Sequence, residues 1–185
     1  MNENLYSIPN IETKRLRLRA WRQADFQPLS IAYADPNFMK FIGNGVPLSP
    51  QESWRSMAMM IGHWHLKGFG LWAVEDKITN EFVGRIGLFE PEGWPAIEIG
   101  WGIVPEHWGK GYAYEGALAV KQWAFEQLKL DALISIIHPD NLPSIALAKK
   151  LGALFSHQEN IGNSAFSIYK MTLTSSSSTK LLLKE

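Results

Sequence analysis

The stretch that decides the fold is Glu98-Ile-Gly-Trp-Gly-Ile-Val-Pro-Glu-His-Trp-Gly-Lys-Gly-Tyr-Ala113. Within residues 96–104, apolar side chains alternate with Glu98 and two glycines, and this period of two predicts a strand. Glycines inside a strand mark a bulge or the close approach of a ligand. From residue 112 to residue 129 the apolar spacing is that of a helix. We therefore expect a strand, a tight glycine loop and a helix in direct succession.

The loop in residues 105–113 is a candidate anion site. Glycines let the backbone fold so that successive N–H groups point inward, and the following helix presents its positive N-terminal end. Lys110 adds one positive charge. An ordinary strand-to-helix turn is the alternative. Known nucleotide motifs do not fit, because Gly111 stands where a Walker A loop needs Ser or Thr, and Tyr114 stands where a dinucleotide fingerprint needs glycine.

The rest of the chain adds further strands and helices around this stretch. The patterns predict strands at residues 15–20, 70–75, 82–89, 132–137, 155–157 and 166–173, and helices at residues 25–34, 50–66 and 143–151. The helix at 50–66 has clear ends, since Ser49 is a cap with Glu52 three residues later and Gly68 follows the last turn. This order indicates an α/β protein with a mixed sheet.

A dense basic cluster lies at the first strand, where Arg15, Arg17 and Arg19 alternate with apolar residues, and Lys14 and Arg22 flank them. Alternation predicts that the arginines share one wet face of the sheet. We expect acidic neighbours on that face, with a phosphate or acidic-partner patch as the alternative.

Composition excludes several classes of function. The chain has 185 residues, enough for one domain, and its 18 Lys and Arg residues balance 18 Asp and Glu residues. We therefore expect no non-specific binding to nucleic acid or to an anionic membrane. There are 0 cysteines, so disulfides, thiolate metal sites and cysteine nucleophiles are excluded. His63 and His65 lie two apart, on different faces of a helix, and no metal site is expected.

Neither the interior nor the start of the chain suggests export or membrane insertion. No apolar stretch reaches the roughly 18 residues that span a bilayer, and residues 1–6 lack the basic and apolar regions of a secretory signal. We expect a cytoplasmic protein.

Four motifs in order resemble the GNAT superfamily of acetyl-CoA-dependent N-acetyltransferases, in particular its RimJ/RimL-like branch. They are Thr13-Lys-Arg-Leu-Arg-Leu-Arg19, Phe82-Val-Gly-Arg-Ile-Gly-Leu88, the stretch at residues 98–113, and Asn141-Leu-Pro-Ser-Ile-Ala-Leu-Ala-Lys-Lys-Leu-Gly152. The resemblance implies a GNAT fold, with a bent, mixed but mostly antiparallel sheet, helices on both faces and a splayed central strand pair. It also implies one acetyltransferase domain at residues 1–173, followed by a polar tail at residues 174–185.

The same resemblance implies acetyl-CoA as cosubstrate, with no metal. In the family the diphosphate is held by backbone N–H groups of a Q/R-x-x-G-x-G/A loop, which corresponds here to Trp108, Gly109, Lys110, Gly111, Tyr112, Ala113 and Tyr114. Trp108 departs from the general pattern. Ile103 and Val104 are expected to pair with the pantetheine arm, and Asn141 and Ser144 match an N-x-x-S element near the sulfur end.

Acetyl transfer to an amine requires a proton acceptor, because an alkylammonium has a pKa near 10.4. Glu98 is the best-placed carboxylate, and a sheet-face pair with Arg85 is the alternative role. A backbone N–H near residues 101–103 is expected to stabilise the oxyanion. Where many relatives have a tyrosine acid, this chain has none, so Ser144 is the remaining candidate. Without cysteine, transfer is expected to be direct.

The acceptor is the least determined part of the site. The expected acceptor is a primary amine, either a protein N-terminal amine or a small amine. The alternative function is a non-catalytic acyl-CoA-binding or regulatory module on the same fold. A homodimer through Leu181–Leu183 stays open. The aromatic candidates for the acceptor cleft, each weighed against core packing, are Trp64, Trp72, Trp94, Trp101, Tyr33 and Phe38, and Trp94 is the strongest.

Overall fold

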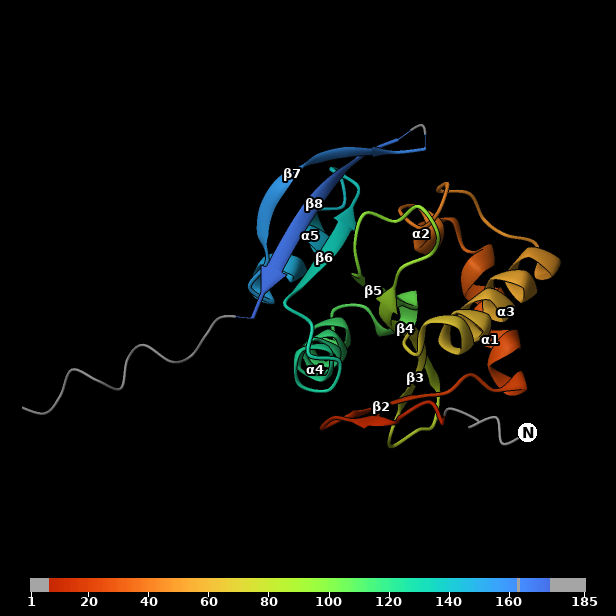
Figure 1. Cartoon of the computed structure of the whole chain (residues 1–185). Helices are drawn as coiled ribbons and strands as arrows, with labels where there is room; N and C mark the ends of the chain where they lie inside the picture. The colour runs from red at the N-terminus through yellow and green to blue at the C-terminus, as the bar shows by residue number, and fades with distance from the viewer. Residues whose placement is uncertain (1–6, 163, 174–185) are drawn as a thin grey trace, which may run out of the picture.

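The structure is a computed structural model, in which residues 7–162 and 164–173 are described. The predicted tail at 174–185, with the leucines that suggested a homodimer, lies outside the described residues. One eight-stranded sheet runs through the molecule in the order β1-β2-β3-β4-β5-β6-β8-β7 (Figure 1). The strands are β1 Ile11–Glu12, β2 Leu16–Arg19, β3 Leu71–Asp76, β4 Phe82–Phe89, β5 Glu98–Ile103, β6 Ala132–Ile137, β7 Leu154–Ile161 and β8 Ser164–Thr172.

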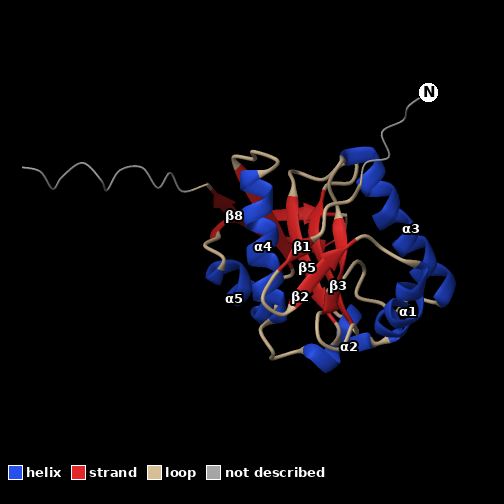
Figure 2. Ribbon diagram, turned by 90° about the horizontal axis from the view of Figure 1, so that it is seen from below, coloured by secondary structure: helices blue, strands red, loops and turns tan. Residues whose placement is uncertain are grey.

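Helices cover both faces of this sheet, as expected (Figure 2). On one face lie α4 (Tyr112–Glu126) and α5 (Leu142–Lys150), and on the other lie α1 (Phe26–Ala34), α2 (Pro36–Met39) and α3 (Pro50–Lys67). Every neighbouring pair of strands is antiparallel except β5 and β6. The mixed, mostly antiparallel sheet is therefore confirmed.

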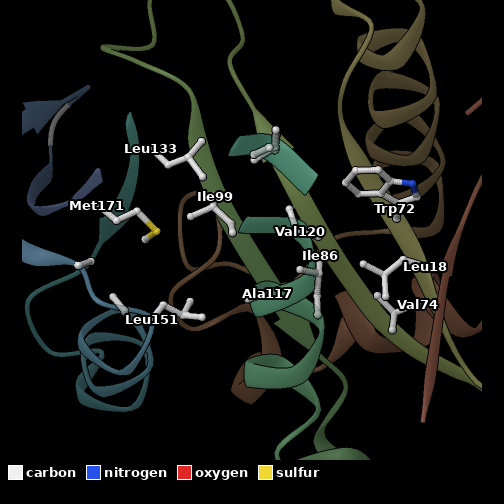
Figure 3. Close-up of a cluster of buried hydrophobic side chains, with 14 of the residues drawn as sticks. Leu18, Trp72, Val74, Ile86, Ile99, Ala117, Val120, Leu133, Leu151 and Met171 are labelled. Carbon is white, nitrogen blue, oxygen red and sulfur yellow. The ribbon is translucent and has the colours of Figure 1, made fainter. Parts of the chain in front are cut away.

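The larger hydrophobic core lies between the sheet and α4 (Figure 3). Ile86 and Ile99 of the sheet pack against Ala117 and Val120 of the helix, and all four are fully buried. The helix comes so close that a Cβ atom at Gly116 would lie 2.4 Å from Cδ1 of Ile86. Close approach of α4 matters for function, because this helix begins at the glycine loop.

The predicted elements match the observed ones with four main differences, one of which is the two-residue strand β1, which was not predicted. The predicted helix ends at Ser49 and Gly68 are confirmed, since Ser49 forms a capping box and Gly68 adopts a left-handed φ of 75°. Helix α4 ends three residues earlier than predicted. Strand β7 is longer than predicted. Nearly all its side chains are exposed, so the alternation of buried and exposed residues on which the prediction depended is missing. The four-residue helix α2 was not predicted at all.

The expected splay of the central strands is present between β5 and β6. The two strands pair only at Glu98 and Ile134, where the N–H of Ile134 donates to the carbonyl of Ile97 at 3.0 Å. Beyond this point β5 and β6 no longer pair with each other, although β5 still pairs with β4 and β6 with β8. The bulge expected at Gly100 and Gly102 is wrong, because β4 and β5 pair in unbroken register. These glycines instead leave room for neighbouring side chains.

The basic cluster on β2 meets acidic neighbours, as expected. The buried Arg19 donates two hydrogen bonds to Asp25, at 2.7 and 2.8 Å, and one to Glu75 at 2.8 Å. Arg17 pairs with Glu12 and Glu75. Arg15 takes a different role at the glycine loop, described below. Within residues 7–162 and 164–173, no helix has both the length and the apolar character needed to cross a bilayer.

Candidate active site

The glycine loop offers a row of free backbone donors. Gly109 and Gly111 have φ of 73° and 78°, a left-handed conformation that side chains disfavour. Among the described residues, no acceptor is found for the six backbone N–H groups from Gly109 to Tyr114, whereas the flanking N–H groups of Trp108 and Glu115 are bonded. Because α4 begins within this run, the free donors lie at the positive end of a fifteen-residue helix. This arrangement is suited to an anion such as a diphosphate.

Arg15 holds the loop from behind, a role that its place in the basic cluster did not reveal. Its guanidinium donates to the carbonyl of Lys110 at 2.8 Å and to the carboxylate of Glu115 at 2.7 Å. It also lies 4.5 Å from the centre of the Tyr112 ring. The carbonyl of Lys110 therefore accepts its hydrogen bond on the side opposite the free N–H groups of the loop. The same arginine joins the first turn of α4 to the start of β2.

The predicted loop residues differ in what they present. Tyr112 turns its side chain inward, where its hydroxyl donates to Asp76 at 2.6 Å and lowers the pKa of that carboxyl. Only its backbone N–H is left for a ligand. Lys110 is exposed, with Nζ 3.0 Å from Nδ1 of His107. The half-exposed indole of Trp108 donates to the carbonyl of Ile103 and so covers the end of β5.

The free edge of β5 faces the splay. Backbone groups alternate in direction along a strand, and the carbonyls of Ile97 and Ile99 accept bonds from β6, namely from the Ile134 N–H and the Ser135 hydroxyl. By the same alternation the N–H groups of Trp101 and Ile103 point into the gap. The N–H of Val104 points the other way and donates to Val83 at 3.0 Å. Ile103 is thus better placed for the pantetheine arm than Val104.

Two predicted residues of α5 stand across the gap from β5. Asn141 caps the helix, with its side-chain oxygen accepting from the N–H of Ser144 at 3.3 Å. The hydroxyl oxygen of Ser144 accepts from the indole N–H of Trp101 at 3.2 Å. The Ser144 proton is therefore free to be donated elsewhere.

Glu98 lies where β5 and β6 separate, on the sheet face opposite α4. Its carboxylate accepts from the indole N–H of Trp94 at 2.9 Å. Burial raises the pKa of Glu98 to about 7, although the N–H groups of Trp94 and Ile136 and the charge of Arg85 act in the opposite direction. Glu98 makes no direct ion pair with Arg85 among the described side chains. A carboxylate with this pKa is suited to general base catalysis near neutral pH.

The aromatic candidates divide between core and cleft. Trp64 and Trp72 pack together with ring centres 4.6 Å apart, and Tyr33 is also buried in a core. Trp94 lies against Phe89 and beside Glu98. Phe38 covers Gly102, its Cζ atom 3.2 Å from where a Cβ would be.

Phe41 was not predicted from the sequence, and Arg85 was considered only as a pairing partner of Glu98. Phe41, after α2, contacts His138 at the end of β6 with ring centres 5.4 Å apart, so the segment after α2 reaches the far side of the splay. Arg85 faces the cleft from β4, although its strand pattern gave no sign of a ligand. In the described residues, no group of three or more His, Cys, Asp or Glu side chains is arranged to hold a metal ion.

The chain is similar in sequence and in fold to known acetyltransferases. The model of the acetyltransferase (GNAT) domain matches residues 15–154. An uncharacterized N-acetyltransferase, p20 of Bacillus licheniformis, is 32% identical over 147 residues, covering 78% of this chain and 82% of the relative. A solved acetyltransferase from Agrobacterium tumefaciens str. C58 is 33% identical, with a TM-score of 0.80, and 92% of this chain and 99% of that chain are covered.

A more distant structure shares the fold. RimL, a ribosomal L7/L12 α-N-protein acetyltransferase in complex with coenzyme A, is 16% identical with a TM-score of 0.73. The match covers 89% of this chain and 98% of that one. At this identity the likeness concerns the fold alone.

Proposed function

The chain belongs to the GNAT acetyltransferase family, and from this premise we propose that it transfers the acetyl group of acetyl-CoA directly to a primary amine. The observation that carries the proposal is the run of six backbone N–H groups, from Gly109 to Tyr114, for which the described part of the chain supplies no acceptor. A diphosphate supplies the acceptors that these donors lack. Because the donors are backbone groups, the site needs no net positive charge, which agrees with the balanced composition.

Proton removal is the first task of the site. An alkylammonium must lose a proton before its nitrogen can attack a carbonyl carbon. Glu98 takes this proton in the proposal, directly or through water. Its pKa of about 7 leaves much of it ionised at neutral pH, while its conjugate acid can still release the proton afterwards.

The remaining steps use groups on both sides of the splay. As the amine nitrogen bonds to the thioester carbon, the carbonyl oxygen gains negative charge, and the N–H groups of Trp101 and Ile103 point toward this region. The C–S bond then breaks. A thiol has a pKa near 8.5, so the leaving sulfur needs little help, and the hydroxyl proton of Ser144 is the candidate donor on α5.

The acceptor amine belongs to a protein N-terminus or to a small molecule. RimL is named as acting on a protein α-amine, and a spermidine N-acetyltransferase from Vibrio cholerae has the same fold at 20% identity. Because both likenesses concern the fold alone, neither chooses the acceptor.

The test is release of free thiol from acetyl-CoA in the presence of a panel of amines, alongside calorimetric binding of coenzyme A. We expect coenzyme A to bind and at least one amine to accelerate thiol release. If coenzyme A binds while no amine in a broad panel has an effect, a non-catalytic acyl-CoA-binding role replaces the proposal. If coenzyme A does not bind, the loop assignment is wrong.

A further inference from the structure

Arg85 lies on the sheet face opposite α4, and none of the ion pairs among the described residues includes it. Residues 84, 86 and 88 of β4 face α4, as the buried Ile86 shows, so Arg85 faces the opposite side. It pairs in register with Gly102 of β5, four residues along from Glu98 on the same face. The glycine loop lies at the N-terminus of α4, on the other side of the sheet. The guanidinium therefore shares the sheet face of Glu98 and is separated by the sheet from α4.

The guanidinium lacks the partners that an enclosed arginine normally has. Arg85 is partly buried, and its Nε atom is buried with no hydrogen-bond partner. No ion pair or hydrogen bond joins its side chain to any of the residues that the structure describes. Other enclosed arginines of this chain differ sharply, since Arg19 is fully occupied by Asp25 and Glu75. A buried N–H donor without an acceptor is costly, and a bound carboxylate would supply the acceptor that Nε lacks among the described residues.

The spacing between Arg85 and Glu98 suits one small molecule. Four residues of strand separate their positions, roughly 13 Å between Cα atoms. Two long side chains shorten this span from both ends. Between them, the side chains of Phe38 and Ile42 lie over Gly102, 3.2 and 3.6 Å from where a Cβ would be, so a molecule bound there would contact an apolar surface.

We propose that the acceptor is an amine that also carries a carboxylate, such as a free amino acid with an apolar side chain. This inference rests on the proposed acetyl transfer. Arg85 binds the carboxylate through paired N–H donors, a geometry that favours carboxylates over other groups. Glu98 binds the ammonium and removes its proton. The acceptor nitrogen and carboxylate are then held from opposite ends, which also orients the nitrogen for attack. A protein N-terminus, whose first residue has no free carboxylate, fits less well.

The experiment compares acceptors that share one amine skeleton and differ in whether it carries a carboxylate. L-phenylalanine, L-phenylalaninamide and 2-phenylethylamine are assayed by thiol release with the wild-type protein, Arg85→Met and Arg55→Met. Arg55 is an exposed arginine on α3 and serves as the matched control. For the wild type we expect kcat/KM to be about 10- to 100-fold higher with phenylalanine than with the other two. The advantage should disappear in Arg85→Met, chiefly through KM, and persist in Arg55→Met.

The outcomes separate this inference from the function on which it rests. If all three amines are acetylated equally, or the two without a carboxylate react faster, the acceptor class is wrong while acetyl transfer stands. If Arg85→Met slows all three equally and only moves the pH profile, Arg85 acts on Glu98 and not on the acceptor. If no amine of any class accelerates thiol release, the proposed function itself fails. The wild-type comparison alone suffices should the variant not fold.

Discussion

Replacing Glu98 by glutamine is expected to make the protein more stable and less active. Burial raises the pKa of Glu98 from its ordinary value of 4.5 to about 7. The folded state therefore binds this proton more tightly than the unfolded state does. Between about pH 4.5 and pH 7, stability falls as pH rises, and above pH 7 the full cost of burying the charge is present. This direction is opposite to that of an ordinary ion-paired glutamate.

The size of the effect follows from the same shift. A change from 4.5 to about 7 corresponds to about 3 kcal/mol at most. Since the Glu98 side chain is partly exposed, solvent reduces this figure. We expect Glu98→Gln to unfold with a free energy roughly 1–3 kcal/mol higher than the wild type at pH 8.5, and with a nearly equal value at pH 4.5.

Urea unfolding at both pH values measures the difference, and Glu92→Gln is the matched control. Glu92 lies exposed in the loop before β5, so its replacement should change stability by less than about 0.5 kcal/mol at either pH. Equal stability of Glu98→Gln and wild type at pH 8.5 would show that the carboxylate is not enclosed as described.

Activity provides the second readout of the same variant. The wild type should lose kcat/KM below about pH 7 as Glu98 becomes protonated. Glu98→Gln should lose this acidic limb and about 10²- to 10⁴-fold in kcat. An unchanged rate and profile would remove Glu98 as the base, whatever its effect on stability.

Three further variants test the loop and the base. Gly111→Ala places a side chain on a residue with a φ of 78°, so we expect coenzyme A affinity to fall at least tenfold by calorimetry. The control is Gly162→Ala, because Gly162 has a φ of 60° with open space around it, and this variant should keep full affinity. Trp94→Phe removes the donor that lowers the pKa of Glu98, so the acidic limb should move to higher pH, and an unmoved limb contradicts the contact. Arg15→Met removes the hydrogen bonds to the Lys110 carbonyl and to Glu115, and should weaken coenzyme A binding about tenfold. Unchanged affinity would show that the loop keeps its conformation without these bonds.

The local elements of the fold were predictable because their signals are local. The helix ends at Ser49 and Gly68 follow from backbone hydrogen bonding within a few residues. Strand β5 was visible in its period-two alternation. Strand β7 was underestimated because it lies at the sheet edge with exposed side chains, which removes the alternation on which a prediction depends. The prediction of a bulge at Gly100 and Gly102 was wrong because a glycine inside a strand can also make room for a neighbouring side chain, as Gly102 does for Phe38.

The sequence by itself determined the glycine loop between a strand and a helix, the carboxylate of Glu98 and the order of elements, since each depends on residues close together in the chain. Only the tertiary structure decided what surrounds them. The hydrogen bond from Arg15 to the carbonyl of Lys110 joins residues 95 apart. The buried Nε atom of Arg85 is found to lack a partner only when the described residues around it are placed in space. The pKa of Glu98 depends likewise on desolvation by several elements at once. Contact and burial are properties of the packed chain, and for that reason the chemistry of this site became specific only in the folded protein.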